Sequence, residues 1–380
     1  MFKKNKISKL FFIYSLVFSL SASSQVFREL PEFNQISQFV RGKGFIPHCD
    51  GLLIDDPMKK FGPHFFLNSI DPQALPVPDQ IRIMIYNFEG LFKLRGDVAK
   101  TDEEIDAGVR LIKQHAPHII GASEVENIQA MGKAAAEWFN QEYFSLSVPD
   151  NDEFINLGLF IKRIAFEIEV QSYREVDHLY LGKKVKLFSR DLPVYIFRDK
   201  GAGPKSQPRF IFVGTHFKSQ RDYRDLVTNQ ILDRDSAVKR HAQFDYAQEI
   251  IEELIKKYPG VPLLFGGDMN MDVEEAQDMS EFEALGFVDT FDLMKYPKNS
   301  QQRVTHSFFP GRGGGVYNQM DAIYVDGVTA KSGRVLKAFA APHVDRNGKP
   351  KPLPHTFEER ALDASDHRPV IVDIDISVKH

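Results

Sequence analysis

Side chains capable of acid–base or metal chemistry adjoin five apolar runs in this sequence. The run LLFGGD at residues 263–268 ends on Asp268, and Asn270 comes two positions later. One such ending is common where a strand stops in a turn, because Gly, Asp and Asn are turn residues. Similar endings recur at Asn87 with Glu89, at Glu124, at His216, and at Asp366 with His367. Recurrence at five runs favours one functional face, since converging strand ends bring their side chains together.

The chemical types in this set suit a hard metal ion. Carboxylate and amide oxygens are ligands for Mg²⁺, Mn²⁺ and Ca²⁺. The chain has one cysteine and no histidine pair at helical zinc spacing, which disfavours a structural zinc site. The histidines are suited to proton transfer or to phosphate charge. Neither a Gly-x-Ser-x-Gly nucleophile elbow nor a phosphate-binding P-loop is present.

The elements that must position these side chains interleave irregularly. Residues 81–87, IRIMIYN, alternate with the period of a strand. Further strands are predicted at residues 118–124, 157–163, 188–197, 209–216, 261–268, 320–326 and 367–376. Helices are predicted at residues 101–117, which open with a Thr-x-x-Glu capping box, and at residues 131–140 and 240–258. Several neighbouring strands have no helix between them, which predicts a two-sheet sandwich flanked by helices rather than a doubly wound sheet.

The N-terminus has the organisation of a secretory signal peptide. Four Lys precede an apolar stretch at residues 10–20 that is too short to favour a membrane span, and small residues follow. We expect residues 1–24 to be removed, giving a secreted protein, periplasmic or extracellular, with no stable membrane insertion. An uncleaved anchor is the alternative. Residues 25–79, rich in Pro and turn residues, are predicted to form an irregular extension, and residues 80–378 the main domain.

Charge and cysteine content limit the partners. The net charge is −4 for the 380 residues, and loss of the leader's four Lys takes it to about −8. An acidic protein does not hold a polyanion by charge alone, so a phosphate substrate would be bound through a metal and a few local cations. The single cysteine excludes a disulfide within a monomer, so the fold depends on its core.

Taken in order, the polar segments resemble the motifs of the endonuclease/exonuclease/phosphatase superfamily, the group of deoxyribonuclease I, abasic-site endonucleases, sphingomyelinases and inositol polyphosphate 5-phosphatases. The similar segments are YNFEGLF (86–92), ASEVEN (122–127), THFKSQ (215–220), GGDMN (266–270) and SDHRPV (365–370). The resemblance covers residues 81–376. Within the superfamily, these motifs are most similar to those of secreted bacterial nuclease-like members. It implies a four-layer α/β sandwich of two mainly antiparallel sheets flanked by helices.

The resemblance also implies a metal site and a substrate site. Glu124 would be the main metal ligand, assisted by Asp366 and Glu89. The ion would be Mg²⁺, with Mn²⁺ or Ca²⁺ as alternatives. Asn87 and Arg190 would bind substrate, and Asn87 is an alternative helper for the metal.

The remaining motif residues would carry the catalysis. Asp268 would orient or deprotonate the attacking water, and Asn270 would hydrogen-bond the water or the phosphoryl oxygen. His216 would contact a non-bridging oxygen. His367 would act as acid/base or as a cation beside the developing charge, oriented by Asp321.

Departures from the family pattern limit what is carried over. Ser123 stands where Gln is usual, and Glu126 stands where deoxyribonuclease I-like enzymes carry Arg, so the DNA contacts of that enzyme are not transferred. Residues 341–364 lie outside the shared pattern as an insert. The sequence predicts a secreted metal-dependent phosphodiesterase, most readily a nuclease with nucleic acid as its partner. A sphingomyelinase-like phospholipid or small-molecule phosphoesterase is the alternative, and a non-catalytic binding module is a third. DNA and RNA, endo- and exo-cleavage, and the oligomeric state stay open.

Overall fold

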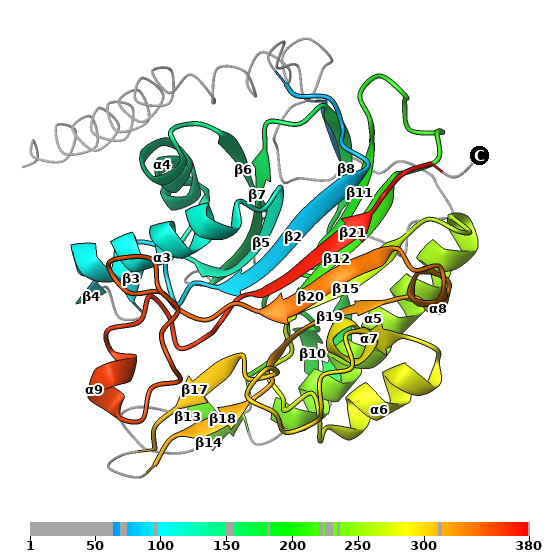
Figure 1. Ribbon diagram of the computed structural model, residues 1–380. Coiled ribbons are helices and arrows are strands. Elements are labelled where there is room, and N and C mark those ends of the chain that lie inside the picture. Colours follow the sequence, from blue (N-terminus) through cyan, green and yellow to red (C-terminus); the bar gives the residue numbers. More distant parts are fainter. Residues whose placement is uncertain are drawn as a thin grey trace, which may run out of the picture. The chain divides into compact units, whose positions relative to one another are not determined.

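Two β-sheets lie face to face in the computed structural model (Figure 1). It describes residues 64–68, 74–94, 98–148, 155–180, 183–219, 223–224, 231–233, 236–310 and 314–378. They fall within one compact unit, Pro57–His380. The seven-stranded sheet has the order β1-β8-β11-β12-β15-β19-β16, and the six-stranded sheet has the order β20-β21-β2-β5-β7-β6. Neighbouring strands are antiparallel except for β12 with β15 and β2 with β5.

The strands of the seven-stranded sheet are β1 (His64–Asn68), β8 (Phe166–Gln171), β11 (Val194–Asp199), β12 (Phe210–His216), β15 (Leu263–Asp268), β16 (Val288–Asp289) and β19 (Asp321–Val325). Those of the six-stranded sheet are β2 (Gln80–Asn87), β5 (Ile119–Val125), β6 (Tyr143–Val148), β7 (Asn156–Lys162), β20 (Val335–Ala340) and β21 (Val370–Asp375). Two-stranded ribbons are formed by β3 (Lys93–Leu94) with β4 (Val98–Ala99), β9 (Asp177–Tyr180) with β10 (Lys183–Lys186), β13 (Tyr223–Arg224) with β14 (Ile231–Asp233), and β17 (His306–Phe308) with β18 (Val316–Asn318). The helices are α3 (Asp102–His115), α4 (Ile128–Phe139), α5 (Ser236–Lys257), α6 (Gln277–Ala284), α7 (Thr290–Leu293), α8 (Gly327–Lys331) and α9 (Phe357–Arg360).

Alternation along β2 separates the two faces of the six-stranded sheet. Ile83 and Ile85 belong to the core between the sheets, whereas Met84 and Tyr86 belong to a second core with residues of α3 and α4. A third core joins α5, including Ile251, to the outer face of the seven-stranded sheet. Figure 1 shows α3 with α4 and α5 with α6 on opposite outer sides of the two sheets. This order of helix, sheet, sheet and helix confirms the predicted four-layer α/β sandwich.

Local capping signals set the helix starts. The Thr101 hydroxyl accepts the backbone N–H of Glu104 at 3.2 Å, and the Glu104 carboxylate accepts the backbone N–H of Thr101 at 2.7 Å, which is the predicted capping box. Helix α4 begins at Ile128, three residues before its predicted start at residue 131, because the Asn127 side chain accepts the N–H of Ala130 at 2.8 Å.

The predicted strand at residues 188–197 is wrong in its first half, since β11 begins only at Val194. The preceding residues form a turn around the buried Asp191. Its carboxylate accepts the Ser172 hydroxyl at 2.6 Å and the backbone N–H groups of Tyr173 and Leu192, each at 2.7 Å. These bonds satisfy the carboxylate locally and direct this backbone away from a sheet ladder.

Three strands, β1, β8 and the two-residue β16, join the seven-stranded sheet where no strand was predicted. Strand β8 contains Glu167 and Glu169, which interrupt its apolar pattern but are both buried. Strand β1, His64–Asn68, falls inside the range predicted as an irregular extension and pairs antiparallel with β8 at the sheet edge. The predicted signal peptide lies outside the described residues.

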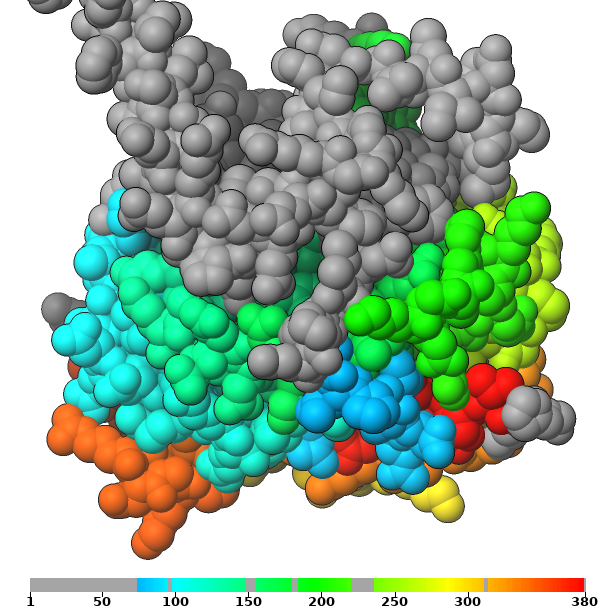
Figure 2. All heavy atoms as spheres, turned by 90° about the horizontal axis from the view of Figure 1, so that it is seen from above, coloured from blue at the N-terminus to red at the C-terminus, as the bar shows by residue number. Residues whose placement is uncertain are grey.

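The N-terminal end of β2 lies on the face shown in Figure 2. There the first residues of β2 (blue) lie beside the end of β21 (red), as expected from the antiparallel pairing of Gln80 with Asp375. Strand β2 therefore runs away from this face toward Asn87. Within the described part of the chain, no helix is long and apolar enough to cross a membrane.

Candidate active site

Strand register brings the predicted site residues to one end of the sandwich. In the parallel pair of β12 and β15, His216 lies opposite Asp268, and in the antiparallel pair of β15 and β19, Asp268 lies opposite Asp321. In the other sheet, Asn87 lies opposite Ser123, one residue before Glu124. Hydrogen bonds and close approaches between these side chains join the two sheets at this end.

Asp268 lies at the centre of the site and is buried. Its Oδ2 accepts a hydrogen bond from Asn87 Nδ2 at 3.0 Å, and it lies 3.4 Å from His216 Nε2 and 3.9 Å from His367 Nε2. Its Oδ1 accepts the backbone N–H of Asn270 at 2.8 Å. Burial raises the pKa of Asp268 above its ordinary value. A carboxylate with a raised pKa, surrounded by polar groups, is suited to accept a proton.

His367 forms a buried pair with Asp321. Its Nδ1 lies 2.7 Å from Asp321 Oδ2, and its Nε2 lies 3.5 Å from Asn87 Nδ2. Burial lowers the pKa of His367, but the carboxylates of Asp321, Asp268 and Asp366 outweigh it and hold the pKa well above its ordinary value. His367 is therefore an imidazolium at neutral pH, oriented through Nδ1.

The hydroxyl groups of Thr305 and Ser365 hydrogen-bond the backbone of Asp321 and His367. The Thr305 hydroxyl accepts the N–H of Asp321 at 2.9 Å. The Ser365 hydroxyl accepts the N–H of His367 at 3.1 Å and donates to the carbonyl of Asn87 at 2.7 Å. These bonds fix the loop before β21 against the end of β2.

His216 has the opposite protonation preference. Burial, and then the charges of Arg190 and His367, lower the pKa of His216 well below its ordinary value, so the ring is neutral. Its Nε2 lies 3.7 Å from Glu124 Oε1, and its buried Nδ1 has no hydrogen-bond partner in the described residues. Ligand atoms of Glu124, His216 and Asp268 all lie within 4.8 Å of one another. The Glu124 carboxylate and its neighbours offer ligand atoms of the kind that hold a divalent metal ion.

Arg190 reaches the site from the turn before β11. Its Nη1 donates to the carbonyl of Phe217 at 2.8 Å, and Asn270 Nδ2 donates to the same oxygen at 2.9 Å. Both side chains are buried. Arg190 thus lies beside His216 and Asn270 and is not a surface residue of a strand.

Three site residues hold a left-handed backbone: Glu89 has φ 51°, Glu124 has φ 53° and Asn270 has φ 52°. This conformation costs an L-residue about 1–2 kcal/mol. Hydrogen bonds hold it in place, because Gly90 N–H donates to the Glu124 carbonyl at 2.8 Å and Glu89 N–H donates to Asn87 Oδ1 at 3.0 Å. Strain retained in this way is characteristic of functional sites.

Glu89 and Asp366 both contact Arg360, a residue outside every motif of the sequence. Arg360 Nη2 lies 2.5 Å from Glu89 Oε2 and 3.2 Å from Asp366 Oδ2. Burial and the charge of Asp366 raise the pKa of Glu89. Burial also acts to raise the pKa of Asp366, but His367 and Arg360 outweigh it and lower the pKa. Arg360 lies in the insert, residues 341–364, where no motif marked it.

His306 and Lys100 were also missed. His306 Nε2 lies 3.8 Å from Asp366 Oδ2, and its Nδ1 lies 3.0 Å from Asn318 Oδ1. Burial lowers the pKa of His306 to about 4. Lys100 Nζ donates to the carbonyls of Phe88 and Ala364, each at 2.7 Å, which ties the loop after β2 to the loop before β21. Neither residue follows an apolar run, so the strand-end signal did not find them.

Glu126, the departure from the deoxyribonuclease I pattern, has a structural role. Its carboxylate accepts the backbone N–H groups of Leu91 at 2.9 Å, Phe92 at 2.7 Å and Lys93 at 2.8 Å. It therefore fixes the loop that follows Asn87 and Glu89.

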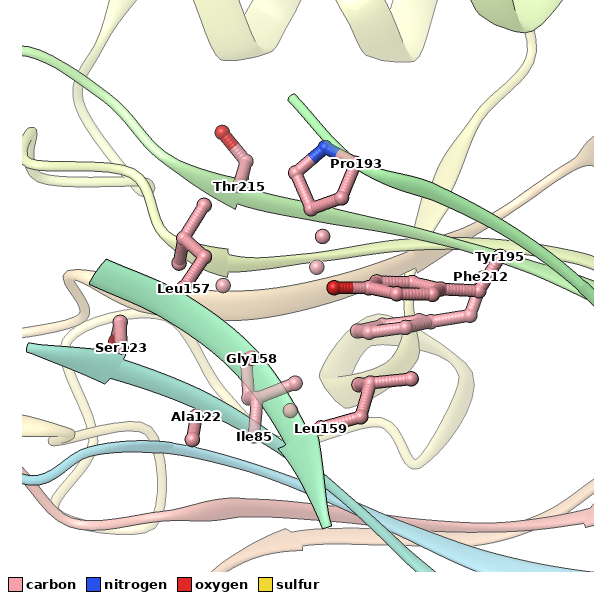
Figure 3. A pocket seen from close by; sticks show the side chains of 14 residues that line it. Ile85, Ala122, Ser123, Leu157, Gly158, Leu159, Pro193, Tyr195, Phe212 and Thr215 are labelled. Atoms are coloured by element: carbon pink, nitrogen blue, oxygen red, sulfur yellow. The ribbon is translucent and has the colours of Figure 1, made fainter. Parts of the chain in front are cut away.

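A small cavity lies between the sheets near the site (Figure 3). Its lining includes Ile85, Leu157, Pro193, Tyr195, Phe212 and several glycines. The space of about 20 Å³ holds about one water molecule. The buried Thr215 hydroxyl lines it and has no hydrogen-bond partner among the described residues, so a water there would satisfy it. A substrate does not fit in this cavity and would have to bind at the strand ends.

No family model and no curated protein matches this chain. Solved structures do. The catalytic domain of human nocturnin with a bound sulfate anion matches with a TM-score of 0.52 and 15% identity, over 82% of this chain and 96% of that one. TDP2 from D. rerio complexed with single-strand DNA product matches with a TM-score of 0.51 and 13% identity, over 78% and 99% of the two chains. The chain has the endonuclease/exonuclease/phosphatase, or deoxyribonuclease I-like, fold, which confirms the predicted resemblance at the level of the fold.

Proposed function

We propose that this protein is a divalent-cation-dependent phosphodiesterase that hydrolyses nucleic acid. The observation that carries the proposal is the joint arrangement of Asp268, His216 and the Asp321–His367 pair at one end of the sandwich. Glu124 and Asp366 would hold the cation, which would stabilise negative charge on the phosphoryl oxygens. Mg²⁺ is the proposed ion, with Mn²⁺ or Ca²⁺ as alternatives.

The protein's own groups divide the proton transfers. Asp268, buried and with a raised pKa, takes the proton of the attacking water. Asn270 and Asn87 orient the groups around it, since both hydrogen-bond Asp268. His367 gives its Nε2 proton to the leaving oxygen, and Asp321 stabilises the imidazolium. His216 and Arg190 bind the non-bridging oxygens, where charge grows in the transition state.

Two observations support nucleic acid as the substrate. One fold neighbour, TDP2 from D. rerio, was solved with single-strand DNA product. The cavity near the site holds about one water, which suits a polymer bound along the strand ends better than a small molecule enclosed in a pocket. Because the chain is acidic, few phosphates would be neutralised by side chains.

A substrate panel tests the proposal. Purified protein at micromolar concentration is incubated with plasmid, RNA, sphingomyelin and inositol phosphates, each with Mg²⁺, Mn²⁺, Ca²⁺ or excess EDTA. We expect nucleic acid to be cleaved fastest, EDTA to abolish cleavage, and Mg²⁺ or Mn²⁺ to restore it, because the cation would stabilise the negative charge that develops on the phosphoryl oxygens. The Asp268→Asn variant, purified in parallel, controls for contaminating nucleases.

Two outcomes would contradict it. Full turnover in excess EDTA would exclude a role for a divalent cation in the hydrolysis. Intact plasmid and RNA beside hydrolysed sphingomyelin or inositol phosphate would replace the nuclease with a phosphoesterase of the alternative class.

We also propose that the protein is exported and that residues 1–24 are removed. The basic start, short apolar stretch and small residues support this. Expression of the full chain in a bacterial host, followed by N-terminal sequencing of protein from periplasm and medium, should give a mature N-terminus near Gln25. Protein found only inside the cell with an intact leader would contradict export.

A further inference from the structure

We propose that Arg360 occupies the position of a second cation, between Glu89 and Asp366, so that the site takes up one divalent ion where its acids would otherwise accommodate two. The inference rests on the divalent-cation site proposed above. It assigns a function to the insert at residues 341–364, which the sequence left without one.

One nitrogen atom makes both contacts. Arg360 Nη2 lies 2.5 Å from Glu89 Oε2 and 3.2 Å from Asp366 Oδ2. The side chains of Arg360, Glu89 and Asp366 are only 16%, 29% and 24% exposed, so water screens the two acids weakly. Two carboxylates this close need a cation or a proton between them. The guanidinium supplies the charge permanently, since Arg stays protonated in proteins.

The insert fixes Arg360 from both sides. Helix α9 begins after Thr356, whose hydroxyl accepts the N–H of Glu359 at 3.2 Å, and Arg360 is its last residue. After it, Asp363 N–H donates to the Arg360 carbonyl at 2.9 Å, and the Asp363 carboxylate pairs with Lys351. The guanidinium is thus presented by an anchored turn, as a built-in ligand of the two acids requires.

The acids of the site fall into two groups, one at Arg360 and one at His216. Arg360 contacts Oδ2 of Asp366, whereas Oδ1 lies 3.7 Å from His367 Nε2. Glu124 faces His216, and Glu89 is not part of that group. Glu89 is therefore held by Arg360 and does not ligate the divalent ion, although the family resemblance assigned it to the metal.

Equilibrium Mn²⁺ binding tests this without an activity assay. Metal-free full-length protein is titrated with Mn²⁺, and free Mn²⁺ is measured by its electron paramagnetic resonance signal. We expect Arg360→Gln to bind one more Mn²⁺ than the wild type, because removal of the guanidinium leaves the cation position between Glu89 and Asp366 vacant. The double variant with Glu89→Gln should lose the additional ion. Arg346→Gln is the matched control, since Arg346 lies in the same insert and pairs with the exposed Glu103 at 2.9 Å. It should bind as the wild type does.

An Arg360→Gln variant with wild-type stoichiometry would overturn the inference. So would weaker binding in that variant, because loss of a partner that merely orients a metal ligand costs about 10–100-fold in affinity. Glu89→Gln alone gives a second test that does not depend on the folding of Arg360→Gln. We expect its Mn²⁺ affinity to stay close to that of the wild type, and a fall of about 10-fold or more would make Glu89 a metal ligand. The cation site is tested separately by Glu124→Gln: unchanged Mn²⁺ binding there would refute the proposed site, whatever Arg360 does.

Discussion

The Asp268→Asn variant should lose about 10³-fold in kcat and keep its fold, since a positioned general base contributes 10²–10⁴-fold. Asp268 Oδ2 accepts a hydrogen bond from Asn87 Nδ2 and lies 3.4 Å from His216 Nε2. The amide removes the proton acceptor and, in one orientation, directs an N–H group at the Asn87 amide. The volume of the side chain is unchanged, so the core is not disturbed. Hydrolysis of bis(p-nitrophenyl) phosphate, with circular dichroism and thermal unfolding in parallel, measures both effects.

Asp373→Asn is the matched control for this prediction. It makes the same change on β21, where Asp373 pairs with Arg82 at 2.6 Å. This pair is at the other end of β2 from Asn87. We expect some loss of thermal stability and a kcat within about twofold of the wild type, because the carboxylate makes no contact with the site. A near-wild-type kcat in Asp268→Asn would remove Asp268 from the mechanism.

The strand ends of the site could be predicted because their signals are local. A buried strand has apolar residues up to its last position, and the polar residue that follows is placed by the strand itself. Asp268 and His216 are therefore neighbours as soon as β12 and β15 pair in parallel. Which strands pair with one another cannot be seen from any single strand. That information came from the order of the motifs, through the resemblance to a known fold.

Arg360 could not be predicted, because its role depends on contacts far apart in the chain. It lies 271 positions from Glu89, in an insert whose composition resembles a loop. Charged loop residues are usually solvated. Only the packing of the insert against the loop after β2 makes this arginine part of the site.

Strand β8 was missed for a related reason. Glu169 interrupts its apolar pattern, and a buried carboxylate is costly unless it is paired. Its partner is Arg198, a fully buried residue of β11, with Nη1 2.9 Å from Glu169 Oε2. Within either strand alone, a charged residue is expected to be exposed. The ion pair between the two strands allows both charges to be buried.

The Asp321→Asn variant should lower kcat at neutral pH by about 10²-fold and move the alkaline limb of the pH–rate profile to lower pH. Burial lowers the pKa of His367, and Asp321 is the largest of the carboxylates that outweigh it. Without that charge the pKa falls, and the imidazolium that protonates the leaving oxygen is lost at a lower pH. An Asn amide at position 321 can also donate a hydrogen bond to Nδ1 of His367, and it would then stabilise the wrong tautomer of the ring.

The raised pKa of His367 should also make the free energy of unfolding depend on pH. A raised pKa contributes stability that is complete below the unfolded value of about 6.5 and is lost as pH rises through the folded pKa. The wild type should therefore lose more unfolding free energy than Asp321→Asn between pH 6 and alkaline pH, as urea denaturation measures. Asp326→Asn is the control: it removes a carboxylate just beyond the other end of β19, and Asn caps α8 as well as Asp does. It should leave the alkaline limb where it is. If that limb is unchanged in Asp321→Asn as well, His367 is not the group that titrates, and its role as proton donor to the leaving oxygen is wrong.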